Sequence, residues 1–406
     1  MKKLIFPTII ISIFVALILS CSDKNENDFI SSVEQSTEYD NALNLLTEFI
    51  NTYELPTRNN TNITFNITNV IQEEIKIPNE LKEIATRSSN SVQTETVNIY
   101  RFDFENNGEK GFAISVGDKR INTMLCYVEK GSIEDTLYNE SMAEYISNLK
   151  YFIYNKLEQI DFPSIETRAT AIQVSKGPIM NLAWAQGWPY NINCPIKNCS
   201  KNNGMALVGC PGVAVMQSLA FMSPQMIKNW HPNVIQYRTQ KTISSTYSDL
   251  HGFGNYVRWI ADGVGTSYGC DKSSSDMGKV SKFLSKYNVS YHHKSSNNMH
   301  LGKAVYTIHT HNCPIICRGM RHKKSGGHQW VIEGHRGWMY SGINYDVVKG
   351  QTQYWYCNWG WGGSGNGWYV GYMTPRWSGD DSGTEMSGTY HNNNDFIYLG
   401  WYTWYH

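Results

Sequence analysis

The chain has 406 residues, balances 35 basic against 35 acidic side chains, and is rich in Tyr, Trp and Gly, whereas only 17% of it is charged. Because the net charge is zero, no basic surface of the kind that binds nucleic acid is expected, and we predict no nucleic-acid partner. The composition is typical of an extracellular, β-rich protein with an aromatic core, and the length allows two domains.

The N-terminus predicts secretion and lipid attachment. Two lysines precede an apolar stretch over residues 4–20, which is short for a membrane span and typical of a signal peptide. The residues Ile18-Leu19-Ser20-Cys21 resemble a bacterial lipobox, so Cys21 is the expected lipidation site. An uncleaved anchor helix is the alternative. We therefore expect a lipoprotein precursor in the bacterial cell envelope, with a mature part that is extracellular or periplasmic.

The residues from about 35 to 162 indicate a small α+β unit. The stretch YDNALNLLTEFINTY has its apolar residues on one helical face, and two alternating runs around Asn106-Asn107-Gly108 predict a hairpin. Ser141 and Glu144 form a capping-box pattern ahead of a second amphipathic helix. A linker follows at residues 162–181, where Pro, Ser, Thr, Lys and Arg mix without periodicity.

Nine cysteines are present, and eight remain if Cys21 carries lipid. Cys194 and Cys199 could pair locally in CPIKNC, but a chain of this length can bury an adequate core without a disulfide framework. Cys210 has a different setting, since it lies between Gly209 and Pro211. Pro is favoured at the first position of a helix, so Cys210 is expected at the N-cap or just before it. The free amides and the helix dipole there lower a thiol pKa, although a small buried cysteine is the simpler interpretation.

A nucleophilic cysteine needs a base and a group that orients the base. His328 follows two glycines and begins an alternating apolar strand, and Asn358 and Trp359 open a Gly/Trp-rich hairpin. Their order and spacing after Cys210 are close to the papain signature, which places His and Asn roughly 130–150 residues downstream. Gln186, in the stretch NLAWAQGWPYN, lies upstream of the cysteine and is a candidate second donor to an oxyanion, beside the Cys210 amide.

Four blocks of sequence together resemble the streptopain family of secreted bacterial cysteine peptidases. They are Trp-x-Gln-x-x-Pro-Tyr-Asn, Gly-Cys at a helix start, Gly-His-x-Trp-Val-Ile-x-Gly and Asn-Trp-Gly-Trp-Gly-Gly, and they span about residues 182–370. The first half resembles the propeptide domain of that family more loosely, in IYRFDF and GFAISVGD. The chain departs from the family pattern at Ala185, Pro211 and Glu333, none of which is a catalytic group.

The resemblance implies an α+β fold with a papain-like catalytic domain, in which a helix carries the nucleophile and an antiparallel sheet carries the histidine. Residues 1–21 would be the signal peptide, 22–168 a tether and inhibitory prodomain, and 169–406 the catalytic domain. The expected site contains Cys210 as nucleophile, His328 as base, Gln186 at the oxyanion, and Asn358 and Trp359 orienting and shielding the histidine.

The implied function is a zymogen cysteine endopeptidase that needs no cofactor. Its expected partners are protein or peptide substrates, its own prodomain as an inhibitor, and a membrane through the lipid anchor of the precursor. A Cys/His amidase acting on peptidoglycan peptides and an inactive surface-binding protein remain alternatives. A metal site at His309, His311 and Cys313, or at His292-His293, is not favoured, because the chain has no His-Glu-x-x-His motif.

Overall fold

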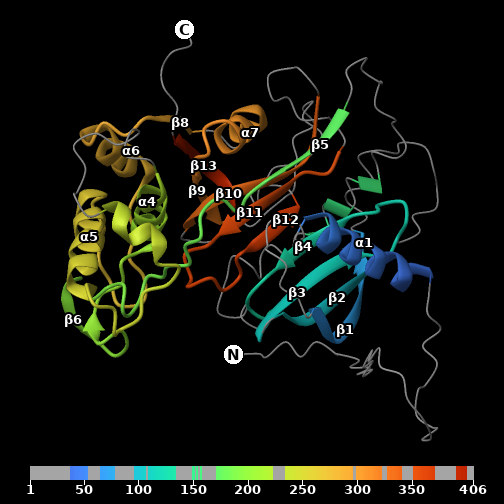
Figure 1. Ribbon diagram of the computed structural model, residues 1–406, viewed down its shortest axis with the longest axis horizontal. Coiled ribbons are helices and arrows are strands. Elements are labelled where there is room, and N and C mark those ends of the chain that lie inside the picture. Colours follow the sequence, from blue (N-terminus) through green and yellow to red (C-terminus); the bar gives the residue numbers. More distant parts are fainter. Residues whose placement is uncertain are drawn as a thin grey trace, which may run out of the picture. The chain divides into compact units, whose positions relative to one another are not determined.

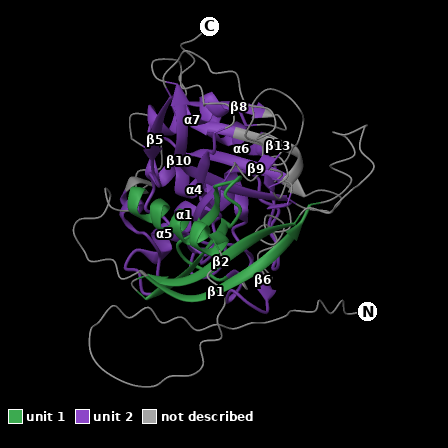
Figure 2. Cartoon of the chain, turned by 90° about the vertical axis from the view of Figure 1, so that its right-hand side faces the viewer, with its two compact units in different colours: residues 1–132 green, residues 133–406 purple. Residues whose placement is uncertain are grey.

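The computed structural model describes thirteen parts of the chain: residues 37–53, 65–77, 96–106, 108–133, 149–150, 152–153, 156–157, 171–222, 234–295, 299–321, 327–340, 351–370 and 390–399. The predicted signal peptide with Cys21, the capping box at Ser141 and Glu144, and residues 162–170 of the linker lie outside the described residues. Two compact units, residues 1–132 and 133–406, divide the chain (Figure 2). The division at residue 168 stays a prediction. Within the described parts, every helix is too short or too polar to span a bilayer.

Unit 1 is a helix and a four-stranded antiparallel sheet. Helix α1 (Thr37–Tyr53) comes first, and the strands β1 (Phe65–Lys76), β2 (Thr96–Asn106), β3 (Glu109–Val116) and β4 (Met124–Val128) lie in the sheet in chain order (Figure 1). The predicted face of α1 is confirmed, because Ala42, Leu46 and Phe49 are buried. The ring of Phe49 lies 5.8 Å from that of Tyr127 on β4, which joins helix and sheet in one apolar core.

The predicted hairpin joins β2 to β3. Asn106 pairs with Glu109, which leaves a two-residue turn, and Gly108 adopts a φ of 80° there. Such turns need positive φ values that glycine adopts without a steric penalty. The aromatic side chains of Phe102 and Phe104 on β2 and of Phe112 on β3 are buried.

Unit 2 contains a larger antiparallel sheet. Its strands lie in the order β12-β11-β10-β9-β13-β8, and β5 pairs with the second half of β10. The strand bounds are β5 (Ala171–Lys176), β8 (Tyr291–Ser295), β9 (Ile315–Arg321), β10 (Gly327–Tyr340), β11 (Tyr354–Asn358), β12 (Gly367–Val370) and β13 (Tyr390–Leu399). Helices with an antiparallel sheet confirm the predicted α+β class.

The helices of unit 2 gather beside this sheet around α4 (Cys210–Phe221), as Figure 1 shows. Every residue from Pro211 to Ala220 is buried, so α4 is apolar all round and central to the core. It packs against strand β10 and against the 3₁₀ helix η3 (Val234–Thr239) and α5 (Leu250–Gly263). The remaining elements are α6 (Met277–Lys286), α7 (Leu301–His309) and the short hairpin of β6 (Ile196–Cys199) and β7 (Gly204–Met205).

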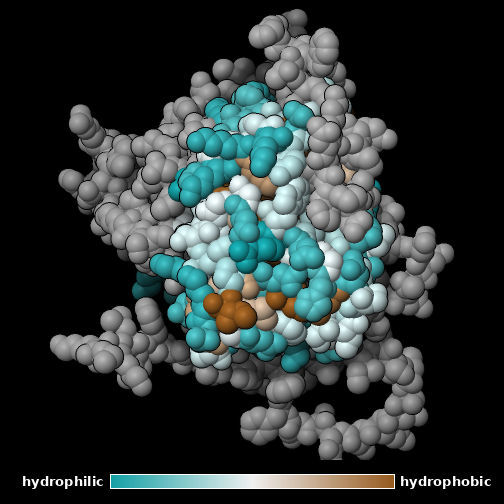
Figure 3. All heavy atoms as spheres, turned by 90° about the vertical axis from the view of Figure 1, so that its left-hand side faces the viewer, coloured by the Kyte–Doolittle hydropathy of each residue, from teal (hydrophilic) through white to brown (hydrophobic). Residues whose placement is uncertain are grey.

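Large exposed apolar side chains are scattered over the described surface. They are Ile172, Trp188 and Ile196. Figure 3 shows a face on which hydrophobic residues form only small patches among hydrophilic ones. Isolated apolar residues of this kind are normal on protein surfaces and do not define an interface.

Candidate active site

Cys210 is the first residue of α4, one position further into the helix than the sequence predicted. Gly209 is the N-cap, and its φ of 89° is one that residues with a Cβ rarely adopt. A Cβ on Gly209 would also lie 3.0 Å from the backbone oxygen of Ser273. Cys210 therefore follows a tight turn that only glycine fits, and its half-buried thiol is held at the start of a rigid helix.

The environment of the Cys210 thiol favours its neutral form. Burial raises its pKa to about 11, although the backbone amides of Gln329 and Cys210 and the charge of Arg318 lower it. The lowered pKa expected from the helix start is therefore wrong, because the loss of solvation outweighs the amides. The Gln329 amide belongs to the residue that follows His328 on β10. The sulfur is therefore near the strand that carries the histidine, and its raised pKa leaves the thiol in need of a proton acceptor.

His328 is buried near the start of β10, among three tryptophan rings. Its ring stacks on Trp361 at a centroid distance of 4.7 Å and lies 5.9 Å from Trp359 and 6.4 Å from Trp330. Its Nε2 lies 3.0 Å from the carbonyl oxygen of Trp359. A carbonyl oxygen only accepts hydrogen bonds, so Nε2 carries the proton in the neutral ring and Nδ1 is left as the basic atom.

Asn358 lies beside this arrangement and does not orient the histidine directly. Among the described residues, its side-chain amide bonds to Leu182, Gln217, Glu333 and Gly360, and not to His328. The contact that the sequence led us to expect from the Asn358 side chain comes instead from the backbone of Trp359. Sequence reasoning missed it because a carbonyl group is present in every residue and gives no signal in a motif.

Gln186 is half-buried on the segment that runs beside the approach to the cysteine. Its carbonyl oxygen accepts a hydrogen bond from Val208 N at 3.0 Å, two residues before Cys210. Two residues before Gln186, the carbonyl oxygen of Trp184 accepts a hydrogen bond from Gly362 N of the Gly/Trp-rich loop at 3.1 Å. The backbone thus places Gln186 next to the turn that precedes the thiol. Its part as an oxyanion donor remains a prediction.

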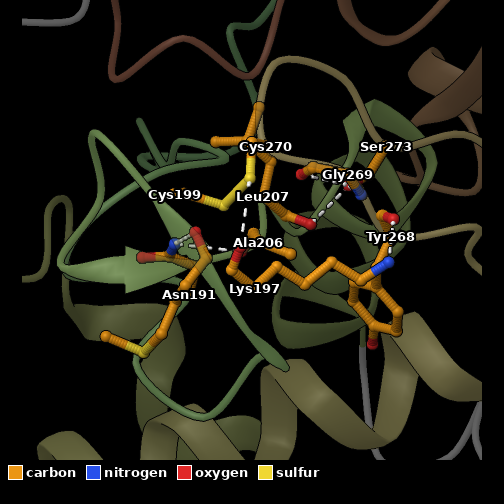
Figure 4. Close-up of a disulfide and its surroundings, with 10 residues drawn as sticks. Asn191, Lys197, Cys199, Ala206, Leu207, Tyr268, Gly269, Cys270 and Ser273 are labelled. Atoms are coloured by element: carbon orange, nitrogen blue, oxygen red, sulfur yellow. Dashed lines mark hydrogen bonds between the residues drawn. A yellow bond between two sulfur atoms is a disulfide. The ribbon is translucent and has the colours of Figure 1, made fainter.

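A disulfide lies close in sequence to the residues that contact the segment before Cys210. Cys199 pairs with Cys270, whereas Cys194 is a free, buried thiol, so the local pair considered from the sequence does not form (Figure 4). The segment after Cys270 packs on the residues that lead into α4. Ser273 Oγ donates to Leu207 O at 2.7 Å, and Leu207 N donates to Gly269 O at 3.0 Å, as Figure 4 shows.

The histidines considered for a metal have other partners. His309 is the last residue of helix α7, and its Nε2 is 3.0 Å from Nδ1 of His335. His292 lies 2.9 Å from the Lys303 ammonium, and His293 lies 2.9 Å from the Ser281 hydroxyl. Within the described parts of the chain, no three His, Cys, Asp or Glu side chains gather in a way that could hold a metal ion.

A cysteine at the start of a central helix, beside an antiparallel sheet that carries a histidine, is the arrangement of papain-like proteins, and this is the class that the fold and the site define. Residues 184–369 match the model of the peptidase C10 family, which is the streptopain family, and this match confirms the resemblance seen in the four motifs.

Two further comparisons complete this result. Comparison with curated proteins found no significant match. Among solved structures, the chain is similar to a fragment of Prevotella intermedia prointerpain A that carries a cysteine-to-alanine mutation. The sequence identity is 17% and the TM-score is 0.49, over 73% of this chain and 94% of the other.

Proposed function

We propose that the chain is a cysteine endopeptidase made as a zymogen, with Cys210 as nucleophile and His328 as general base. The observation that carries this proposal is the pairing of two features on one strand. The backbone amide of Gln329 acts on the Cys210 thiol and lowers its pKa, and the preceding residue His328 holds its Nε2 proton on the Trp359 carbonyl. The match to the peptidase C10 family over residues 184–369 supports the same assignment.

The chemistry follows from these positions. Nδ1 of His328 takes the proton of the thiol, and the sulfur attacks a peptide carbonyl carbon to give a tetrahedral oxyanion. The Cys210 backbone amide and the Gln186 side chain would stabilise that oxyanion. The imidazolium then protonates the leaving amine as the C–N bond breaks. Water, deprotonated by His328, hydrolyses the thioester and restores the thiol.

Proton transfer from Cys210 to His328 forms an ion pair, which lowers the free-energy cost of a buried thiolate. A lone thiolate would be costly in this environment, which raises the pKa of Cys210 to about 11. An imidazolium formed in the same step supplies an opposite charge nearby, and the Trp359 carbonyl stabilises its Nε2–H. The reactive form is therefore the pair and not the free thiolate.

We extend the proposal to maturation and location. Residues 22–168 act as an inhibitory prodomain, and lipid on Cys21 anchors the precursor to a membrane. The sequence places the activating cut between Thr167 and Ile179. Strand β5 narrows this window, because Ala171–Lys176 pair with Tyr340–His335 of β10 and a protease needs an unpaired segment. We expect the cut before Ala171, so that a soluble enzyme leaves the anchored part.

Labelling with an epoxysuccinyl inhibitor, followed by peptide mapping, tests the peptidase assignment. We expect label on Cys210 and cleavage of casein, with both lost in Cys210→Ala. Cleavage of purified peptidoglycan but not of casein would replace the endopeptidase with an amidase. An unchanged function in Cys210→Ala would indicate a binding protein.

Maturation needs a separate experiment. N-terminal sequencing of the product from wild type and from Cys210→Ala tests the cut, and addition of residues 22–168 in trans to residues 169–406 tests inhibition. Palmitate labelling of wild type against Cys21→Ser tests the anchor. A full-length, fully active wild type would contradict the zymogen while leaving the peptidase assignment in place.

A further inference from the structure

The peptide group between Trp359 and Gly360 is held at both ends. Its carbonyl oxygen lies 3.0 Å from Nε2 of His328, and its N–H donates to Oδ1 of Asn358 at 3.2 Å. Because a peptide group is planar, the orientation of the N–H fixes the orientation of the carbonyl. The Asn358 side chain therefore acts on His328 through one intervening peptide plane.

The Asn358 amide is in turn held in one orientation. Its Nδ2 donates to the Leu182 carbonyl at 2.7 Å and to Oε1 of Glu333 at 2.9 Å. Both partners are acceptors, so the NH₂ group must face them and the oxygen must face Gly360 N. Nε2 of Gln217, on helix α4, donates to Oδ1 of Asn358 at 3.4 Å, and Oε1 of Gln217 accepts from Trp184 N at 3.0 Å.

Glu333 is the charged member of this set. It is 1% exposed, and its second oxygen, Oε2, accepts from Met180 N at 2.7 Å. A buried carboxylate is costly unless hydrogen bonds compensate it, and the mechanism described above gives it no chemical step. Its carboxylate offers acceptors on both sides, to Met180 N and to Asn358 Nδ2. A neutral amide at this position would turn an NH₂ group toward one of these two donors.

We propose that Glu333 is a positioning residue: with Asn358 it fixes the Trp359–Gly360 peptide plane, and so keeps the Nε2 proton of His328 on the Trp359 carbonyl and leaves Nδ1 as the basic atom for Cys210. This inference rests on the proposed function. It assigns a role to a carboxylate that lies on the same strand as His328, five residues further along, and that accepts hydrogen bonds from Met180 N and Asn358 Nδ2.

The test compares Glu333→Gln with a matched control, Gln353→Met. Gln353 is also 1% exposed and bonded within the same sheet, to His335 at 2.9 Å and to the Trp338 carbonyl at 3.2 Å. Both changes remove buried hydrogen bonds, so both should lower the melting temperature. Only Glu333→Gln should lower kcat on a fluorogenic peptide, by about 10- to 100-fold with KM within about twofold, since a misplaced catalytic group can cost about 100-fold.

A second readout does not depend on hydrolysis. The rate at which iodoacetamide alkylates Cys210 is followed against pH, because alkylation reports the thiolate–imidazolium pair. In Glu333→Gln the pH midpoint should move upward, because the imidazolium loses its oriented acceptor, whereas Gln353→Met should keep the wild-type profile. A wild type that is alkylated but hydrolyses no peptide would overturn the proposed function, and the alkylation profile would still decide the role of Glu333.

Two more variants guard against a folding failure. Glu333→Asp keeps the charge and should give a smaller shift in the same direction. Asn358→Ala should shift the profile as Glu333→Gln does, and the double variant should be no worse than Asn358→Ala alone, because both act through one peptide plane. If Glu333→Gln lowers only the melting temperature and leaves kcat and the alkylation midpoint at wild-type values, Glu333 is structural and the inference is wrong.

Discussion

The two compact units differ in what they bury. In the described part of unit 1, the buried polar side chains are Ser115 and Thr123, and the remaining core is apolar. Unit 2 buries a much larger polar set, most of it on β10, β11 and the loop that follows: His328, Gln329, Glu333, His335, Arg336, Gln353, Asn358 and Asn366. Burying polar groups is costly, so their concentration marks the region where the fold is organised around chemistry rather than around stability alone.

The largest expected effect tests this contrast at the proposed catalytic pair, Cys210 and His328. Cys210→Ala should lower kcat on the order of 10⁶-fold, His328→Ala should do the same, and the double variant should lose no more, because the two residues act as a unit. Peptide hydrolysis by the purified proteins measures it, with thermal unfolding as the control for folding. Losses that multiply in the double variant would show that the two residues do not act together.

A core change in unit 1 should affect stability without affecting chemistry. Phe104 is buried and its ring stacks on Tyr127 at 5.2 Å, so Phe104→Ala should destabilise unit 1 by about 3–5 kcal/mol. Hydrogen exchange of β2–β4 measures this, and Gln72→Ala on the exposed part of β1 is the control. In the precursor, alkylation of Cys210 should not become slower, because unit 1 supplies no catalytic group and an unfolded prodomain cannot cover the thiol. A slower alkylation would show that the core of unit 1 contributes to the reactivity of Cys210 in unit 2.

The oxyanion position gives the next effect. Gln186→Ala should lower kcat by about 10²–10³-fold, the size expected when one of two donors is lost. The KM for a peptide should change little, because the interaction forms only in the transition state. Steady-state kinetics on a fluorogenic peptide checks both values. An unchanged kcat would remove Gln186 from the site.

The disulfide should stabilise unit 2 alone. Replacing Cys199 and Cys270 by serine opens a loop with a sequence separation of 71 residues and should cost about 2–4 kcal/mol. Urea unfolding of the double variant measures the loss. Cys194→Ala, which removes a free thiol, is the control and should cost less. A double variant as stable as wild type would contradict a structural role for the bond.

A further prediction concerns the dependence of stability on pH. All 12 histidines of the chain lie in unit 2, and burial lowers the pKa of His335 to about 3 and of His309 to about 4. Below about pH 6.5 the unfolded chain binds protons that the folded chain does not, so stability falls as the pH drops from about 6.5 toward 4, by about 1.4 kcal/mol per pH unit for each proton. Above pH 6.5 neither histidine contributes.

His335→Gln should flatten this dependence. Urea unfolding at several pH values between about 4.5 and about 7 measures it, because the unfolded chain takes up its histidine protons in this range. The exposed His251 supplies the control, because His251→Gln should leave the dependence unchanged. A slope that survives in His335→Gln would mean that other groups cause the acid sensitivity.

Much of the fold was predictable because it depends on local patterns. The apolar face of α1, the turn at Gly108 and a helix start within one residue of Cys210 follow from periodicity and from the conformations of glycine and proline. The partner of Cys199 was not predictable. Its spacing to Cys194 suggested a local bond, whereas Cys270 is brought close only by the packing of unit 2.

The sequence by itself determined the residue types and their order: a cysteine at a helix start, a histidine at a strand start, and the four motifs that match residues 184–369 to the peptidase C10 family. Only the tertiary structure decided how these residues meet. Burial raised the pKa of Cys210, and a backbone carbonyl replaced the Asn358 side chain as the partner of His328. The Asn358 side chain instead donates a hydrogen bond to Glu333. Solvation and backbone geometry depend on every segment that packs around a group, and no local motif records them.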